Sequence, residues 1–136
     1  MKTTFCVFLF YLMVSPGNHL KITPDAISSE TIINVKLNEG EKWPADEATT
    51  QHIENLLGLC QQQLSEKTID DELLREELTR EVDLLNRNTK MTGDARAQLH
   101  NFQLGIRNRI NTISQDRESV LWLTDYLERY YEFFEN

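Results

Sequence analysis

The chain has 136 residues, 40% of them apolar, which is enough for one small domain with a core but not for several membrane spans. Acidic residues outnumber basic ones by 22 to 14, and the formal net charge at pH 7 is -8. This balance argues against nucleic acid as a partner, because phosphate backbones are neutralised by Lys and Arg, and against anionic membrane surfaces.

The N-terminal segment has the layout of a signal peptide. Lys2 supplies a short positive region, residues 5–14 form an unbroken apolar run, and the tripeptide Ser-Pro-Gly follows. The run is short for a transmembrane helix. A buried β-strand is the alternative, since Phe, Val and Tyr favour strands. We expect residues 1–17 to be a signal peptide cleaved near Asn18, which predicts a periplasmic or secreted protein.

The two cysteines support a soluble exported protein without a disulfide. Cys6 precedes most of the apolar run, whereas a lipidation cysteine follows such a run, so no lipid anchor is expected. If Cys6 leaves with the signal peptide, Cys60 is the single remaining thiol and cannot form an internal disulfide. Cys60 lies on an apolar helical face, which predicts a buried, unreactive thiol.

Residues 18–44 are predicted to be a linker followed by an extended arm. Apolar and polar residues alternate along residues 33–37, which is the period of a half-buried strand, and Asn-Glu-Gly at 38–40 then turns the chain. A single short strand has no partner in this sequence. The segment is alternatively an extended arm that lies along helices, with Trp43 as its anchor.

Two helices are predicted in the middle of the chain. The first spans residues 46–64 with Asp46 as its N-cap, and its mid-helix Gly58 costs about 1 kcal/mol relative to Ala unless a neighbour approaches closely. The second spans residues 69–88, with Thr68 as the capping signal. Their apolar stripes have helical spacing and consist of Ile53, Leu56, Leu57, Cys60 and Leu64, and of Leu74, Leu78, Val82 and Leu85.

Two further helices are predicted after the glycine at position 93. The third spans residues 94–113, and its apolar spacing is close to a heptad repeat, as in a coiled coil. The fourth spans residues 116–134 and is apolar over a wide arc. Their stripes consist of Ala95, Leu99, Phe102, Ile106, Ile110 and Ile113, and of Val120, Leu123, Leu127, Tyr130 and Phe134.

These four segments predict an all-α fold. Short connections force successive helices to lie antiparallel, so residues 45–136 are expected to form an up-and-down helical bundle with an extended N-terminal arm. The bundle has four helices if the first one joins it, or three if the first one crosses its end.

The stretch Lys-Met-Thr-Gly-Asp-Ala-Arg-Ala-Gln-Leu-His at residues 90–100 holds the candidate binding residues. Arg96 and His100 lie one turn apart near the start of a helix, where backbone amides also favour anions. With Met91 and Asp94 beside them, they predict a weak site for a carboxylate or another anion. The alternative is a helix corner with a surface histidine.

A metal site is a second interpretation of the same residues. Met91 and His100, with Asp94 as a further ligand, would suit copper in an exported protein, and zinc is also possible. A tight site needs three or four ligands, and no CxxC, HxxxH or EF-hand spacing is present. No cofactor is expected from the remaining sequence.

Two segments resemble a known family. Residues 37–53 carry Leu-Asn-x-Gly-x-Lys-Trp and Glu47, and residues 91–102 carry Met-x-Gly and then Leu99 and His100. This pattern resembles a largely uncharacterised family of small exported helical proteins of Gram-negative bacteria. The resemblance implies export and a helical fold. Arg96 stands where the family pattern has the first of two histidines one turn apart, and Arg with His cannot chelate a metal as two histidines do.

Catalytic motifs are absent from the sequence. It contains no nucleophile elbow, P-loop or glycine-rich dinucleotide motif. Adjacent carboxylates such as Asp70 with Asp71 diverge by about 100° on a helix, which is poor geometry for an acid–base pair. The sequence therefore predicts a protein that is not an enzyme.

The aromatic C-terminal segment predicts an interface. It contains more rings than one helix face hides in a small bundle, and Tyr and Trp are favoured in interfaces. The interface candidates are Trp122, Tyr126, Tyr130 and Phe133. A homodimer or a protein partner would cover them, unless the N-terminal arm with Trp43 does so.

The leading functional prediction is an exported, soluble, non-enzymatic module that binds or senses an unknown protein or small ligand. The alternative is a periplasmic metal-binding protein that uses Met91 and His100.

Overall fold

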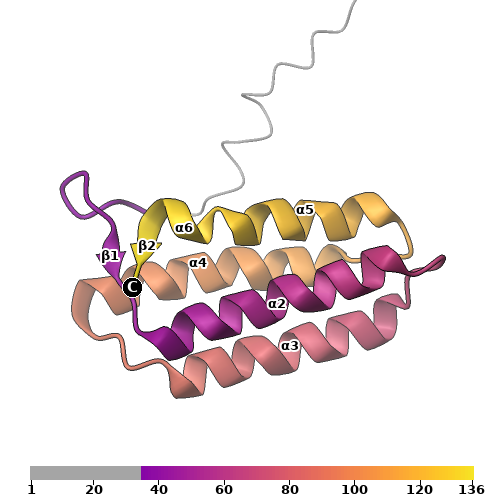
Figure 1. Cartoon of the computed structure of the whole chain (residues 1–136), viewed down its shortest axis with the longest axis horizontal. Coiled ribbons are helices and arrows are strands. Elements are labelled where there is room, and N and C mark those ends of the chain that lie inside the picture. Colours follow the sequence, from indigo (N-terminus) through magenta and orange to yellow (C-terminus); the bar gives the residue numbers. More distant parts are fainter. Residues whose placement is uncertain (1–34) are drawn as a thin grey trace, which may run out of the picture.

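The computed structural model describes residues 35–136 (Figure 1). The predicted signal peptide and most of the predicted linker lie outside the described residues. No helix within residues 35–136 is long and apolar enough to cross a bilayer.

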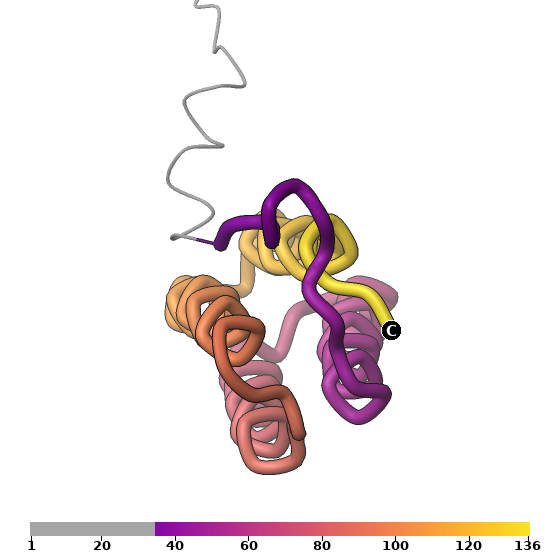
Figure 2. The backbone as a smooth tube through the Cα atoms, turned by 90° about the vertical axis from the view of Figure 1, so that its left-hand side faces the viewer, coloured from indigo at the N-terminus to yellow at the C-terminus, as the bar shows by residue number. Residues whose placement is uncertain are grey.

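Four long helices form an up-and-down bundle, as the sequence predicts. Successive helices run antiparallel, and the last packs on the first as well as on its predecessor, so that all four surround one core (Figures 1 and 2). The first helix therefore belongs to the bundle and does not cross its end. The helices are α2 (Glu47–Ser65), α3 (Asp71–Asn88), α4 (Gly93–Thr112) and α5 (Arg117–Glu128).

The apolar stripes turn inward and account for the bundle. Each helix repeats apolar residues every three or four positions, and burial of these side chains is the main favourable contribution to folding. Cys60 is buried among them, as expected. The central residues of the four stripes are Ile53 and Leu56, Leu74 and Leu78, Leu99 and Ile106, and Val120 and Leu123, all 0% exposed.

The helix starts differ in one case from the prediction. Asp46 caps α2 as expected, since its Oδ1 accepts a hydrogen bond from the Thr49 amide at 2.9 Å. The cap of α3 is Asp70 and not Thr68, because Asp70 Oδ1 accepts from the Leu73 amide at 3.1 Å. The aspartate lies immediately before the helix, where its short side chain reaches the free amides.

The fourth predicted helix is shorter than expected. α5 ends at Glu128, and after Arg129 a single turn, α6 (Tyr130–Phe133), leads into the two-residue strand β2 (Phe134–Glu135). β2 pairs in parallel with β1 (Trp43–Pro44). The helix does not continue through Phe134, because the backbone there is extended and pairs with β1. The Phe134 ring stays buried.

The predicted strand at residues 33–37 is not a strand in its described part. Residues 35–37 instead form an extended arm, which was the alternative interpretation. The Lys36 amide donates to Gln98 Oε1 at 2.8 Å, and Trp43 Nε1 donates to the Lys36 carbonyl at 2.6 Å. These side chains satisfy the backbone N–H and C=O of Lys36, and Trp43 anchors the arm as predicted.

The predicted turn at residues 38–40 is confirmed. Asn38 and Glu41 exchange two backbone hydrogen bonds of 2.8 and 2.9 Å. Glu39 and Gly40 between them have φ values of 52° and 90°. Positive φ at both central residues is the geometry of a type I′ hairpin turn, in which glycine is readily accepted.

Candidate functional site

The predicted binding residues at the start of α4 differ in their burial. Met91 is buried, Arg96 is half-buried, and Asp94 and His100 are exposed. Arg96 Nη2 donates to the carbonyl of Asn86 at 3.0 Å and to its Oδ1 at 2.8 Å. The Arg96 side chain therefore fastens α4 to the last turns of α3, and its observed contacts are those of a helix corner.

The two predicted metal ligands differ in their exposure. Within residues 35–136, no three His, Cys, Asp or Glu side chains gather in a way that would hold a metal ion. Met91 belongs to the core cluster, whereas His100 is on the surface. A copper or zinc site at these two residues remains a prediction from the sequence.

A polar cluster between α2 and α3 was missed from the sequence. His52 Nδ1 lies 2.6 Å from Glu81 Oε1, and His52 Nε2 lies 3.0 Å from Asn88 Nδ2. Asn55 donates to the same Glu81 oxygen at 2.8 Å. His52 and Asn55 lie one turn apart, and Glu81 and Asn88 two turns apart, so each pair shares a helix face. Both ring nitrogens of His52 are engaged, and the cluster ties the two helices together.

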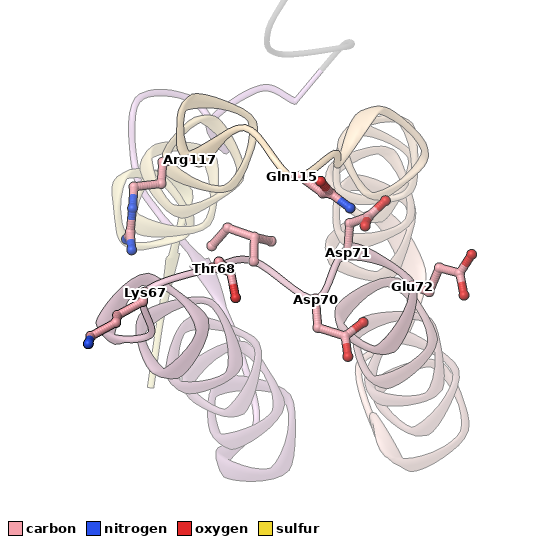
Figure 3. A pocket seen from close by; sticks show the side chains of 8 residues that line it. Lys67, Thr68, Asp70, Asp71, Glu72, Gln115 and Arg117 are labelled. Carbon is pink, nitrogen blue, oxygen red and sulfur yellow. The ribbon is translucent and has the colours of Figure 1, made fainter.

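An open pocket of about 640 Å³ lies at the end of the bundle where the α2–α3 and α4–α5 connections meet. Figure 3 shows Lys67 and Arg117 on one side and Asp70, Asp71 and Glu72 toward the other. The lining therefore carries charges of both signs.

Arg117 at this pocket already has partners. Its Nη1 donates to the Leu64 carbonyl at 2.5 Å, and its Nη2 donates to the Glu66 carbonyl. These carbonyls lie at the C-terminal end of α2, where a cation is favoured by the helix dipole. Arg117 therefore links the start of α5 to the end of α2, and the pocket is best explained as part of this structural contact between the two helices.

The predicted interface residues separate into buried and exposed members. Tyr126 is 1% and Tyr130 0% exposed, which corrects their assignment to an interface, because neither offers surface to a partner. Phe133 is partly buried against the core, and Trp122 is 52% exposed.

Hydrogen bonds and stacking explain why the two tyrosines are inside. Tyr126 Oη donates to the Phe102 carbonyl at 3.0 Å, and the two rings stack with centroids 4.7 Å apart. Tyr130 Oη lies 3.0 Å from Thr50 Oγ1, and its ring stacks on Phe134 at 4.9 Å. The polar tips are satisfied inside the bundle, so burial of these rings carries little penalty.

The outer surface of α5 is left with exposed apolar side chains among acidic ones. Leu121 is 47% exposed and is followed directly by Trp122. At 100° per residue, Glu118 and Asp125 project between them, and Glu128 borders Leu121. These five exposed residues are called the α5 face below. The other large apolar residues that are exposed within residues 35–136 are Leu37, Leu73, Leu104 and Tyr131.

A hollow of about 450 Å³ adjoins the α5 face at the α4–α5 corner, and Glu118 and Trp122 form part of its wall. The corner behind it is held by its own hydrogen bonds. Asp116 Oδ1 accepts from the Glu118 amide at 3.1 Å, and Ser119 Oγ accepts from the Ser114 amide at 3.1 Å and donates to the Asp116 carbonyl at 2.6 Å. The hollow is therefore preformed.

Comparisons of the chain with protein-family models, curated proteins and solved structures found no match.

Cys60 is expected to be chemically inert. Burial raises the pKa of its thiol to about 11, although a hydrogen bond with Thr124 acts to lower it. Only about one thiol in a thousand is then ionised at pH 8, and the thiolate is the reactive form. We predict that iodoacetamide at pH 8 modifies Cys60 about 100-fold more slowly, or slower still, in the native protein than in urea, as followed by peptide mass spectrometry. Equal rates would contradict the buried position.

Proposed function

We propose that this chain is an exported, non-enzymatic binding module that docks a protein partner on the α5 face. The observation that carries the proposal is the exposure of Trp122 beside Leu121, on a bundle whose other large rings are mostly inside. Tryptophan is among the residues that contribute most to binding when a partner buries them. The preformed hollow beside Trp122 provides a concave surface that a side chain of the partner can fill.

The reactive groups of the bundle support a non-enzymatic role. Cys60 is buried with a raised pKa, and both nitrogens of His52 are hydrogen-bonded to neighbouring side chains. His100 is exposed. Nucleophilic catalysis requires a nucleophile within reach of an available base, and neither Cys60 nor His52 fits that arrangement.

The docking surface is tested with a displayed peptide library selected against the purified protein. We predict that peptides recovered on the wild type lose at least tenfold in affinity for Trp122→Ala, because a desolvated Trp contributes about 2 kcal/mol or more to binding. Leu104→Ala, which trims another exposed apolar residue on α4, is the matched control and should leave the affinity unchanged. Fluorescence anisotropy measures the affinities. Peptides that bind wild type and Trp122→Ala equally would exclude the α5 face as the docking surface.

Export is a separate part of the proposal. It is supported by the charged start, the apolar run at residues 5–14 and the small residues after it, together with the family resemblance of residues 37–53. Mass spectrometry of the native N-terminus, after expression in a bacterial host, should find a chain that begins near Asn18. A cytoplasmic chain that retains Met1 would exclude export.

A further inference from the structure

The α5 face carries acidic groups without counter-ions. Glu118, Asp125 and Glu128 take part in none of the ion pairs found within residues 35–136. The nearby basic side chains already have partners. Arg117 donates to carbonyls at the end of α2, and Arg129 pairs with Glu132 at 3.3 Å. From residue 116 to residue 132 the chain has five acidic and two basic side chains. The surface around Leu121 and Trp122 is therefore negative.

We propose that the partner on the α5 face is a basic amphipathic segment of another protein. Its apolar residues cover Leu121 and Trp122, and its Lys or Arg side chains pair with Glu118, Asp125 and Glu128. This inference rests on the proposed function and names the chemistry of its partner. An amphipathic helix that lays its apolar side on a surface is a common mode of recognition.

The spacing of the carboxylates favours a helical segment. Glu118 and Asp125 are two turns apart, which places them roughly 10 Å apart along the helix axis at 1.5 Å per residue. A partner helix with basic residues seven positions apart presents cations at the same interval. The hollow beside Trp122, which Asp116 and Glu118 also line, accepts the first of these cations against the indole ring.

The negative charge of the α5 face also argues against two other kinds of partner, a second copy of this chain and an anionic membrane. In a symmetric dimer through the α5 face, the same carboxylates would meet across the two-fold axis, and like charges in an interface are unfavourable. An anionic membrane surface is repelled for the same reason. A basic partner forms favourable ion pairs with the same carboxylates. The opposite charges also raise the rate of association at low salt.

The test uses the full chain and three synthetic 18-residue peptides with one common leucine stripe. Their polar sides carry Lys, Gln or Glu, and fluorescence anisotropy measures binding in 50 mM and 500 mM NaCl. We expect the Lys peptide to bind at least tenfold more tightly than the Gln peptide, and the Glu peptide most weakly. The affinity for the Lys peptide should fall at least tenfold between the two salt concentrations, because exposed ion pairs are screened.

A charge-matched pair of variants locates the effect. The triple variant Glu118→Gln, Asp125→Asn and Glu128→Gln should lose at least tenfold in affinity for the Lys peptide. The control variant Glu47→Gln, Glu54→Gln and Glu72→Gln removes three exposed carboxylates from α2 and α3 and should keep the wild-type affinity. An equal loss in both variants would show a general effect of net charge and would overturn the inference.

The remaining outcomes separate the inference from the proposed function. If all three peptides bind alike and Trp122→Ala abolishes binding, the α5 face is a docking surface but the basic partner is wrong. If no peptide shows Trp122-dependent binding, the proposed function fails as well. A doubled mass in light scattering that returns to monomer in Trp122→Ala would assign the α5 face to a second copy and overturn the inference.

Discussion

Gly105→Ala is expected to lower the free energy of unfolding by about 1–3 kcal/mol, because it forces a methyl group into a filled part of the core. A Cβ built on Gly105 would lie 2.0 Å from Tyr126 Oη and 2.4 Å from its Cζ. Overpacking of this kind costs about 1–3 kcal/mol, and loss of the tyrosine hydrogen bond adds about 1 kcal/mol. The better helix propensity of alanine returns about 1 kcal/mol.

Tyr126 cannot relieve this overlap by a small movement. One side of its ring stacks on Phe102, the guanidinium of Arg109 lies 4.2 Å from its centroid, and its hydroxyl is held by the Phe102 carbonyl. A displaced ring would leave the Tyr126 hydroxyl without its acceptor in the core. The added methyl therefore moves α4 away from α5 or expels the ring, and both changes lose packing.

Gly58→Ala is the matched control, and the opposite sign is expected. Gly58 also lies in mid-helix, but no heavy atom comes within 4 Å of its added Cβ. No close neighbour offsets the cost of this glycine, so the substitution should raise stability by up to about 1 kcal/mol. Urea unfolding followed by circular dichroism measures both variants. A stabilised Gly105→Ala would show that Tyr126 is not packed against α4 as described.

The four helices follow from local pattern, which explains why they were predictable. Residues such as Leu74, Leu78 and Val82 repeat at the helical period, and the short connections leave antiparallel packing as the simplest arrangement. The β1–β2 pair was missed because it joins Trp43 to Phe134, and nothing in either local pattern reveals such a distant partner. Phe134 also continues the apolar period of α5, which favoured a helix at a position where the chain is extended.

The candidate site was only partly predictable, because exposure depends on neighbouring helices. Trp122 and Tyr126 are four residues apart on one side of α5, yet one is half exposed and the other is buried. The difference arises at Gly105, because the absence of a Cβ there leaves room for the Tyr126 ring to pack directly against α4. Leu121 was missed because the apolar arc of this helix is wide, and its period does not show which edge faces solvent. Of the four rings named as interface candidates, Trp122 is exposed, whereas Tyr126 and Tyr130 are buried.

Asp46 joins two parts of the bundle as well as capping α2. Its Oδ1 accepts from the Thr49 amide at 2.9 Å, and its Oδ2 accepts from the Lys90 amide at 2.9 Å and from Thr89 Oγ1 at 3.2 Å. Thr49 Oγ1 also donates to Oδ2 at 3.0 Å. One carboxylate thus connects the start of α2 to the α3–α4 connection, 44 residues away in sequence.

Asp46→Ala is therefore expected to lower the free energy of unfolding by about 2–3 kcal/mol at pH 7, from about 1 kcal/mol for the cap and about 1 kcal/mol for each charge-assisted hydrogen bond across the connection. Asp70→Ala is the matched control. Its carboxylate caps only its own helix, at Leu73, so its loss should cost only about 1 kcal/mol. Equal losses in the two variants would show that the contacts to Thr89 and Lys90 add nothing.

The advantage of Asp46 should also depend on pH with a defined sign. Burial acts to raise the pKa of this carboxyl, but hydrogen bonds from Thr49, Lys90 and Thr89 outweigh it and hold the pKa below its ordinary value of 3.8. A group whose pKa is lowered by folding contributes stability above its unfolded pKa and loses it as the pH falls through the folded pKa. The stability gap, meaning the difference in the free energy of unfolding between wild type and Asp46→Ala, should therefore have its full size at pH 6. It should become smaller as the pH falls below about 4, as measured by urea titrations. A gap that is unchanged at pH 2.5 would mean that the side chain acts through its shape and not through its charge.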